Sequence, residues 1–368
     1  MTIIPIWLVR LLAPCLAPLR WLVARGWLRD ADVDWWLQRV HPLLSLQRVY
    51  ARVEARHWVA GDMLALTLRC NGNARGWRAG QHVQLFREID GVRLSRSYSL
   101  TRVQANGRIE LAIKRQANGK VSGTLLDKLA VGERLELGQA RGDLSWCADA
   151  SAVLLLAAGS GITPLLGLLR EALVNGYQAP ITLLHYVRQR RQRAFSQELQ
   201  QLMQRYPNFQ VRWALSGESP AAGELAGRFS AGHLADVAVQ HLLVCGPHGF
   251  VEQARDWWQS QPRCHALQCE AFTAPAPLAG GATAAVQLGF AKAQQQVTGN
   301  NQQSLLEQAE EKGLRPAHGC RQGICASCSC QLLSGSVRHL HSGLVTREPG
   351  QAIRLCVSVP LGDVTLDL

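Results

Sequence analysis

Short segments in which apolar and polar residues alternate fill the chain from about residue 48 to about residue 147. Alternation with a period of two is typical of strands that bury one face. Turns rich in Gly, Asn and Asp separate the segments. The pattern predicts an antiparallel β-barrel over residues 48–147. Its strand-length segments are VYARVEARHWVAGDMLALTLRC (49–70), HVQLFREI (82–89), YSLTRV (98–103) and IELAIKRQ (109–116).

The hydrophobic pattern changes from about residue 148. A fully apolar strand, a glycine turn and an amphipathic helix follow one another in SAVLLLAAGSGITPLLGLLREAL (151–173). Further strand-like runs, with helical stretches between them, are ITLLHYV, FQVRWAL, HLLVCG and HALQCE. This order predicts an α/β domain with a parallel sheet over residues 148–272. A stretch rich in Pro, Ala and Gly then predicts a linker over 273–283 and a third domain over 284–368.

Residues 1–47 form an extension that fits neither pattern. Arginines interrupt the apolar residues 1–29, so that no uncharged run is long enough to span a membrane, and no signal-peptide cleavage site follows. Pro14 and Pro18 exclude one continuous helix. Two interpretations remain open. Residues 1–29 are either a helical extension packed on the protein, or a peripheral membrane contact with tryptophans at headgroup depth and arginines on anionic lipid.

Composition narrows the class of protein. A hydrophobic content of 47% excludes wholesale disorder. The excess of 39 Lys and Arg over 27 Asp and Glu gives a net charge of +12, which favours phosphorylated cofactors, acidic proteins or lipid as partners. We expect no nucleic-acid partner, because neither helix-turn-helix nor zinc-finger spacing is present. The 11 scattered cysteines are typical of a reducing compartment, and we expect a cytoplasmic protein, with a peripheral place at the inner membrane surface open.

The sequence AHGCRQGICASCSCQ (317–331) carries the strongest chemical signal. Cys320, Cys325 and Cys328 have the spacing C-x4-C-x2-C, and Cys356 follows on a later strand. Four thiolates in this pattern indicate a plant-type [2Fe–2S] cluster, whereas a structural zinc site more often uses C-x2-C pairs. Cys330 lies outside the spacing and is expected to be a packed thiol.

Two motifs in the predicted barrel indicate a phosphorylated cofactor. The first is RSYS (96–99), which places a cation, an aromatic ring and hydroxyls on one strand. In isolation this tetrapeptide is more typical of a polar edge strand. The second begins at Gly119 and opens a predicted helix, whose free N–H groups suit a pyrophosphate.

The α/β domain carries glycine turns after two of its strands. The sequence GSGITP (159–164) has Pro164 at the third glycine position, so that the usual dinucleotide fingerprint is not met. The second turn is CGPHGF (245–250). Arginines at 188, 190, 191 and 193 follow the second strand, and in that place they favour the 2′-phosphate of NADPH over the ribose hydroxyl of NADH.

The order of these motifs over residues 48–368 resembles the ferredoxin–NADP reductase superfamily, and residues 284–368 resemble a plant-type ferredoxin domain of the β-grasp fold. The resemblance implies a multidomain fold of flavin barrel, nucleotide domain and ferredoxin domain, with FAD favoured over FMN. It implies flavin contacts at Arg96, Ser97, Tyr98, Ser99, Lys114, Gly119, Lys120, Val121, Ser122 and Phe272. It implies dinucleotide contacts at Gly159, Gly161, Ile162, Thr163, Pro164, Arg188, Arg190, Arg191, Cys245, Gly246 and Pro247. Catalytic roles fall to Ser99, Thr163, Cys245 and Glu270, and the cluster ligands are Cys320, Cys325, Cys328 and Cys356.

The resemblance also implies what the chain does. It is expected to be an NAD(P)H-dependent flavin iron–sulfur oxidoreductase, which passes electrons from NADPH through FAD and the [2Fe–2S] cluster to a protein acceptor. The Trp- and Arg-rich extension favours a membrane fatty-acyl desaturase as that acceptor. The first alternative is the reductase component of a soluble oxygenase system. The second is a redox sensor without turnover, and the complete cofactor set speaks against it.

Overall fold

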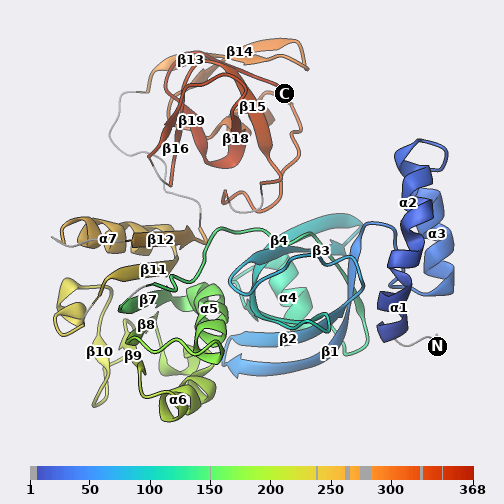
Figure 1. Ribbon diagram of the computed structural model, residues 1–368. Helices are drawn as coiled ribbons and strands as arrows, with labels where there is room; N and C mark the ends of the chain where they lie inside the picture. The colour runs from blue at the N-terminus through green and yellow to red at the C-terminus, as the bar shows by residue number, and fades with distance from the viewer. Residues whose placement is uncertain are drawn as a thin grey trace. The chain divides into compact units, whose positions relative to one another are not determined.

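The computed structural model of the chain describes residues 6–149, 151–237, 239–261, 266–273, 283–323, 326–341 and 343–368 (Figure 1). The chain divides into two compact units. The first is Met1–Gly246 with Gln253–Glu270, and the second is Pro247–Glu252 with Ala271–Leu368.

The N-terminal extension is helical and broken at its prolines. It contains α1 (Ile6–Leu12), the 3₁₀ turn η1 (Pro14–Leu16), α2 (Ala17–Ala24) and α3 (Asp30–Val40). The prolines occupy the first turns of η1 and α2, where a missing N–H is tolerated. The hydrophobic pattern does not predict α3, although its first turn carries two aspartates that favour a helix N-terminus.

Six strands form a closed antiparallel barrel in the order β1-β2-β5-β4-β3-β6, as predicted. Its core is filled by leucines, valines and isoleucines that alternate along the strands, and α4 adds Leu125 and Leu126 to it. Strand β4 begins at Val92, earlier than predicted. Its first residues were not recognised as a strand because they are largely exposed and lack apolar alternation. The elements are β1 (Val49–Ala60), β2 (Met63–Cys70), β3 (His82–Ile89), β4 (Val92–Val103), β5 (Arg108–Lys114), α4 (Lys120–Asp127) and β6 (Arg134–Leu137).

The α/β domain is built on a six-stranded sheet in the order β10-β9-β8-β7-β11-β12. Strands β7 to β11 pair in parallel, as the sequence predicts, and the buried strands β7 and β8 are apolar along almost their whole length. The strands are β7 (Val153–Ala158), β8 (Ile181–Val187), β9 (Phe209–Leu215), β10 (Leu225–Ala226), β11 (His241–Gly246) and β12 (Ala266–Ala271). The helices are η2 (Gly159–Gly161), α5 (Ile162–Val174), η3 (Arg190–Gln192), α6 (Ser196–Arg205), η4 (Ala231–Leu234) and α7 (His248–Gln259).

Helix α5 fastens the parallel sheet to the barrel. A Cβ atom at Gly167 would lie 2.7 Å from the Leu100 carbonyl oxygen and 2.9 Å from the Gly80 nitrogen, so only glycine permits this approach of α5 to β4. One turn later, Arg170 donates to Glu110 of β5 at 2.7 Å and to Glu198 of α6 at 2.5 Å. Both carboxylates therefore compensate the buried guanidinium.

The second unit contains the predicted β-grasp fold. A five-stranded sheet in the order β14-β13-β20-β15-β18 and a three-stranded sheet β17-β16-β19 accompany one helix, α8 (Leu305–Glu311). Ser304 and Glu307 form a capping box at the start of α8. The strands are β13 (Ala285–Phe290), β14 (Gln295–Asn300), β15 (Ser329–Ser334), β16 (Val337–His339), β17 (Val345–Thr346), β18 (Ala352–Arg354), β19 (Ser358–Pro360) and β20 (Val364–Leu366), with the turn η5 (Leu355–Val357).

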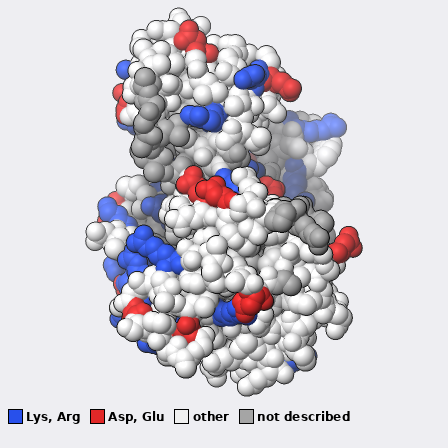
Figure 2. Space-filling model, turned by 90° about the vertical axis from the view of Figure 1, so that its left-hand side faces the viewer, with Lys and Arg blue, Asp and Glu red and all other residues white. Residues whose placement is uncertain are grey.

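Charged side chains on the face shown in Figure 2 form small separate groups divided by wide uncharged areas. Several surface arginines are paired locally, including Arg115 with Asp127 at 2.6 Å and Arg212 with Asp236 at 2.7 Å. Exposed pairs of this kind contribute little to stability. The net charge of +12 is therefore not one continuous basic surface on this face.

Candidate functional site

The RSYS residues lie on β4, beside β3. Arg96 is exposed, Ser97 and Tyr98 are half-buried, and Ser99 is buried opposite His82 of β3. The Ser97 hydroxyl has no hydrogen-bond partner among the described residues, although it is buried. A buried hydroxyl without a partner is costly unless a ligand satisfies it, so this strand suits a polar cofactor such as FAD.

The predicted phosphate turn opens α4. Gly119 is the N-cap residue, and no side chain caps the helix. A Cβ atom at Gly119 would lie 2.5 Å from the Ser122 hydroxyl. Lys120 is exposed, whereas Val121 and Ser122 are buried. The first-turn N–H groups are thus left to an anion, which fits the pyrophosphate of FAD.

The two glycine turns of the α/β domain meet, as their predicted roles require. A Cβ atom at Gly161 would lie 2.0 Å from the Cys245 carbonyl oxygen and 2.9 Å from the Gly246 nitrogen. Gly159 has φ +56°, and Thr163 donates its hydroxyl proton to the Ser160 carbonyl at 2.9 Å. These residues, with the buried Ile162 and Pro164, surround the carboxyl ends of β7 and β11. That edge is where parallel sheets bind dinucleotides.

A buried histidine, which the sequence analysis missed, supports the first glycine turn. His185 Nε2 lies 3.0 Å from the Gly159 carbonyl oxygen. Burial lowers the pKa of His185 to about 4, so the ring is neutral near pH 7 and Nε2–H donates to the carbonyl. Lys114 lies beside the same glycine and forms an ion pair with Asp62 at 3.6 Å. The one signal for His185 in the sequence was a polar residue in the apolar run ITLLHYV.

A second buried pair joins the barrel to the α/β domain. Glu270 Oε1, on β12, lies 3.6 Å from His82 Nδ1, on β3. Burial, with a smaller contribution from Asp143, raises the pKa of Glu270 to about 8. This carboxyl group therefore holds a proton at neutral pH. Because His82 pairs with Ser99 across the strands, the structure brings Glu270 towards the predicted flavin site.

The Cys245 thiol is fully buried at the end of β11. Burial raises its pKa well above the ordinary value, so that it stays protonated. Of the remaining predicted residues here, Pro247 directly precedes α7 and Phe272 directly follows β12, where it is half-buried.

The arginines after β8 differ in their partners. Arg190 pairs with Glu224 at 2.7 Å and with Glu218 at 3.4 Å, and it is the main reason that the pKa of Glu224 is held down at about 2. Arg188 and Arg191 are exposed, and neither forms an ion pair with a described residue. Their charges are the ones left for a phosphate group.

Three of the four predicted cluster ligands lie close together in the second unit. The neighbouring Cys328 thiol, together with burial, raises the pKa of Cys356, and Cys320 adds to this shift. The Gly323 N–H donates to Cys356 Sγ at 3.2 Å, and the Gln322 N–H donates to Cys320 Sγ at 3.3 Å. Such donors stabilise thiolates that ligate iron. Cys325 lies outside the described residues.

The loop around these cysteines has unusual backbone angles. Gly323, Arg321 and Ala326 have φ values of +76°, +56° and +56°. Left-handed conformations at non-glycine residues cluster where a loop binds a ligand. Within the described residues no three His, Cys, Asp or Glu side chains could hold a single metal ion. A two-iron cluster instead divides its thiolates between two metals, and the donor set fits it. Cys330 lies in the hydrophobic core, as expected.

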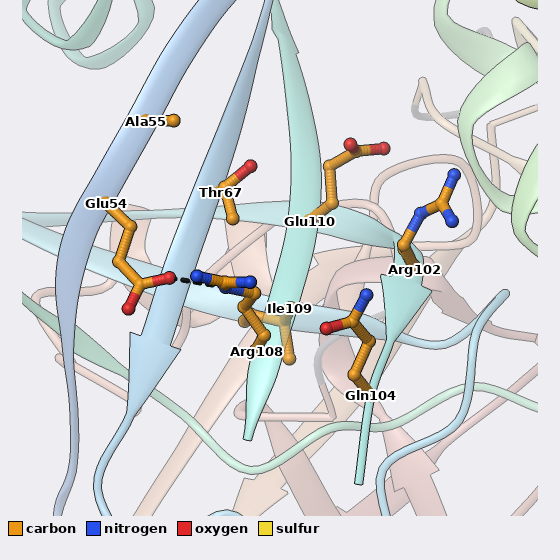
Figure 3. A pocket seen from close by; sticks show the side chains of 8 residues that line it. All are labelled: Glu54, Ala55, Thr67, Arg102, Gln104, Arg108, Ile109 and Glu110. Carbon is orange, nitrogen blue, oxygen red and sulfur yellow. Dashed lines mark hydrogen bonds and ion pairs between the residues drawn. The ribbon is translucent and has the colours of Figure 1, made fainter. Parts of the chain in front are cut away.

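A hollow of ≈ 400 Å³ lies away from these residues, on the outer side of β1, β2, β4 and β5 (Figure 3). Its charged side chains already have partners. Glu54 bonds Arg108 at 2.6 Å and Arg69 at 2.9 Å, and Glu110 accepts from Arg170. We therefore do not assign a cofactor to this hollow.

Three models of known protein families match successive parts of the chain. The oxidoreductase FAD-binding domain matches residues 50–146, the oxidoreductase NAD-binding domain matches 155–256, and the 2Fe-2S iron-sulfur cluster binding domain matches 291–361. The order is the one inferred from the motifs.

Similar proteins cover almost the whole chain. An NADPH oxidoreductase of Mycobacterium tuberculosis is 29% identical over 345 residues, which is 91% of this chain and 88% of that protein. The heme-dependent oxidative N-demethylase beta subunit of Ectopseudomonas mendocina is 33% identical over 303 residues, or 80% of this chain and 90% of that protein. The solved phthalate dioxygenase reductase shares the fold, with a TM-score of 0.57 and 23% identity over 87% of this chain and 98% of that one.

Proposed function

Since the chain belongs to the ferredoxin–NADP reductase superfamily, as a member with a C-terminal [2Fe–2S] domain, we propose that it delivers electrons from NADPH to a membrane fatty-acyl desaturase. The chain is an oxidoreductase that uses NAD(P)H, FAD and a [2Fe–2S] cluster. The choice of NADPH, the acceptor and the residue roles below are the proposed parts.

The protein positions its cofactors from rigid elements. A bound flavin accepts two electrons as hydride and releases them singly, which a one-electron cluster requires. Ser97 and Ser99 offer hydroxyls from β4, and the start of α4 offers N–H groups to phosphate. Gly161 and Cys245 allow the nicotinamide-binding turns to lie against each other. Glu270 is protonated and lies near the predicted flavin site. Neutral His185 donates to the Gly159 carbonyl and so orients the first glycine turn.

The N-terminal extension supports a membrane-bound acceptor. Its helices expose tryptophans and arginines, which suits a peripheral membrane contact on the cytoplasmic side. The competing candidate is the reductase component of a soluble oxygenase, which the names of a similar glycine betaine monooxygenase reductase subunit and of the phthalate dioxygenase reductase favour. The test supplies NADPH and the purified protein to vesicles that hold a fatty-acyl desaturase, and separately to a soluble oxygenase component from the same cell. Unsaturated product should form with the first. Turnover with the second alone would replace the proposed acceptor.

Nucleotide preference should depend on Arg188 and Arg191. Replacing both with alanine removes two guanidinium groups that no carboxylate of the described residues neutralises. We expect the KM for NADPH to rise about tenfold or more, since charged hydrogen bonds of this kind contribute ~1.5–3 kcal/mol. The KM for NADH should change little. Arg212→Ala, whose arginine pairs with Asp236, is the control. Equal changes for both nucleotides would remove the assignment.

The pKa of Glu270 predicts a pH-dependent stability. The folded protein keeps this proton up to about pH 8, whereas the unfolded chain releases it near 4.5. The stabilising effect of the proton is therefore complete below about pH 4.5 and is lost as pH rises through about 8. Glu270→Gln should remove roughly 2–4 kcal/mol of this pH dependence. Tm values at pH 5 and pH 8.5 measure it, with the exposed Glu88→Gln as control. Parallel curves for wild type and Glu270→Gln would contradict the prediction.

A further inference from the structure

Helices α2 and α3 and the turn between them carry an unusual set of exposed side chains. Trp21, Trp27, Trp35 and Trp36 are 48%, 67%, 50% and 65% exposed; we call these four residues the tryptophan surface. Large aromatic side chains seldom lie so far in solvent, and where several do so they mark an interaction site. No function assigned to the barrel, the sheet or the cluster uses them.

Polar contacts fix the helices below the tryptophan surface to the segment before β1 and to the loop after β2. Asp34 of α3 is buried and accepts from the Ser45 hydroxyl and the Leu46 N–H, both at 2.7 Å. Arg20 of α2 donates to the Leu46 carbonyl at 2.8 Å and to Asn73 Oδ1 at 3.1 Å. Within residues 1–29, Arg20 thus contacts the rest of the protein. The tryptophans remain outside the packing.

Helix α3 carries both apolar and polar side chains on each of its two faces. Its inward stripe consists of Val33, Asp34, Leu37 and Gln38, which are buried or half-buried. Its exposed stripe consists of Asp32, Trp35, Trp36, Arg39 and Val40. Residues at spacings of three, four and seven share a helix face. Two aromatic rings and a valine thus face solvent while a carboxylate faces the protein.

Arginines accompany both tryptophan pairs. Trp21 and Trp27 lie 5.7 Å apart between ring centroids, with Arg25 4.4 Å from the Trp21 centroid. Trp35 and Trp36 lie 4.7 Å apart, and the guanidinium of Arg39 stacks on Trp35. Cation–π stacking holds the aromatic rings and the positive charges at the same depth. Arg29, in the turn between the helices, is exposed as well.

We propose that the tryptophan surface, with Arg25, Arg29 and Arg39, docks on the surface of a bilayer that contains anionic lipid. Tryptophan rings favour the headgroup region, and arginines at the same depth are attracted by anionic headgroups. No helix among the described residues is long and apolar enough to cross a membrane, so the contact is peripheral. The inference deepens the proposed membrane contact and rests on it. It also moves that contact from residues 1–29 to 21–40.

The test is cosedimentation of the full-length holoprotein with vesicles of phosphatidylcholine, with and without phosphatidylglycerol, at low salt. The wild type should bind the anionic vesicles and be released by salt. Trp35→Ser with Trp36→Ser, and Trp21→Ser with Trp27→Ser, should each lower the partition coefficient about tenfold or more. Replacing Arg25, Arg29 or Arg39 with glutamine should lower it about fivefold each. Trp58→Ser is the matched control, because Trp58 is 52% exposed but lies on β1 of the barrel.

Each outcome decides the proposal. Tryptophan variants that bind like the wild type, or a wild type that stays in the supernatant, would overturn it. A wild-type dimer that the tryptophan variants dissociate would assign the surface to a second copy instead. Flavin content and NADPH–ferricyanide activity should be unchanged in every variant, which excludes misfolding. The binding test needs no acceptor protein, so its failure would leave the electron-transfer assignment intact.

Discussion

Cys328→Ser should separate the two electron-transfer activities of the protein. The variant should keep bound flavin and most NADPH–ferricyanide activity, because the barrel and the parallel sheet have cores of their own. It should lose nearly all reduction of cytochrome c or of the natural acceptor, because serine is a poor ligand for iron in a thiolate site. The measurements are iron content and the two rates.

The matched control for this variant is Cys330→Ser. Cys330 lies in the same core but outside the ligand spacing, so the variant should keep its iron and its partner activity, with at most a modest loss of stability. Cys328→Ser protein that contains little iron yet reduces its acceptor at the wild-type rate would show that electrons leave directly from the flavin.

Gly161→Ala should lower the rate of flavin reduction by NADPH about 100-fold while the flavin stays bound. A methyl group at this position would lie 2.0 Å from the Cys245 carbonyl oxygen, and the obstacle is backbone that cannot rotate away. The turn or the end of β11 must shift, and a displacement of about 1 Å at a hydride-transfer site can lower the rate about 100-fold. Overpacking should also lower the free energy of unfolding by roughly 1–3 kcal/mol. Stopped-flow reduction by NADPH measures the first effect, and urea unfolding the second.

Gly232→Ala controls for adding a methyl group to the same domain. Its Cβ would lie 3.7 Å from the Ser230 hydroxyl, an ordinary contact, so rate and stability should stay near wild type. Chemical reduction of the flavin by dithionite should be normal in both variants. A Gly161→Ala protein with a wild-type rate of NADPH oxidation would place the nicotinamide away from this turn.

Local signals explain what could be predicted from the sequence. Each of three signals depends on residues that lie close together in the sequence: the alternation in the barrel, the glycine turn after an apolar strand, and the cysteine spacing. The structure and the family models confirm the fold that these signals predict. The site residues named in advance stay predictions. Among those that are described, the structure brings Gly161 close to Cys245, and Cys320 and Cys328 close to Cys356.

The contacts that were missed join residues far apart in the chain. Nothing near His82 indicates that Glu270 will lie beside it. Arg190 was expected to bind a phosphate, but Glu224, directly before β10, pairs with it. Helix α3 was missed because apolar and charged residues occur on both of its faces, so that no clear amphipathic period stands out. Tertiary packing decides each of these features, and no local propensity encodes them.

The close approach of α5 to β4 at Gly167 has a consequence for exchange of modules between related reductases. The interface between the barrel and the parallel sheet requires Gly167 on α5 and Gly80 beside it. It also requires Arg170, which forms ion pairs with two carboxylates. A chimaera that imports a foreign nucleotide domain must import matching partners on the barrel as well. For this chain, exchange with a related reductase should therefore succeed best when the barrel and the parallel sheet are transferred together.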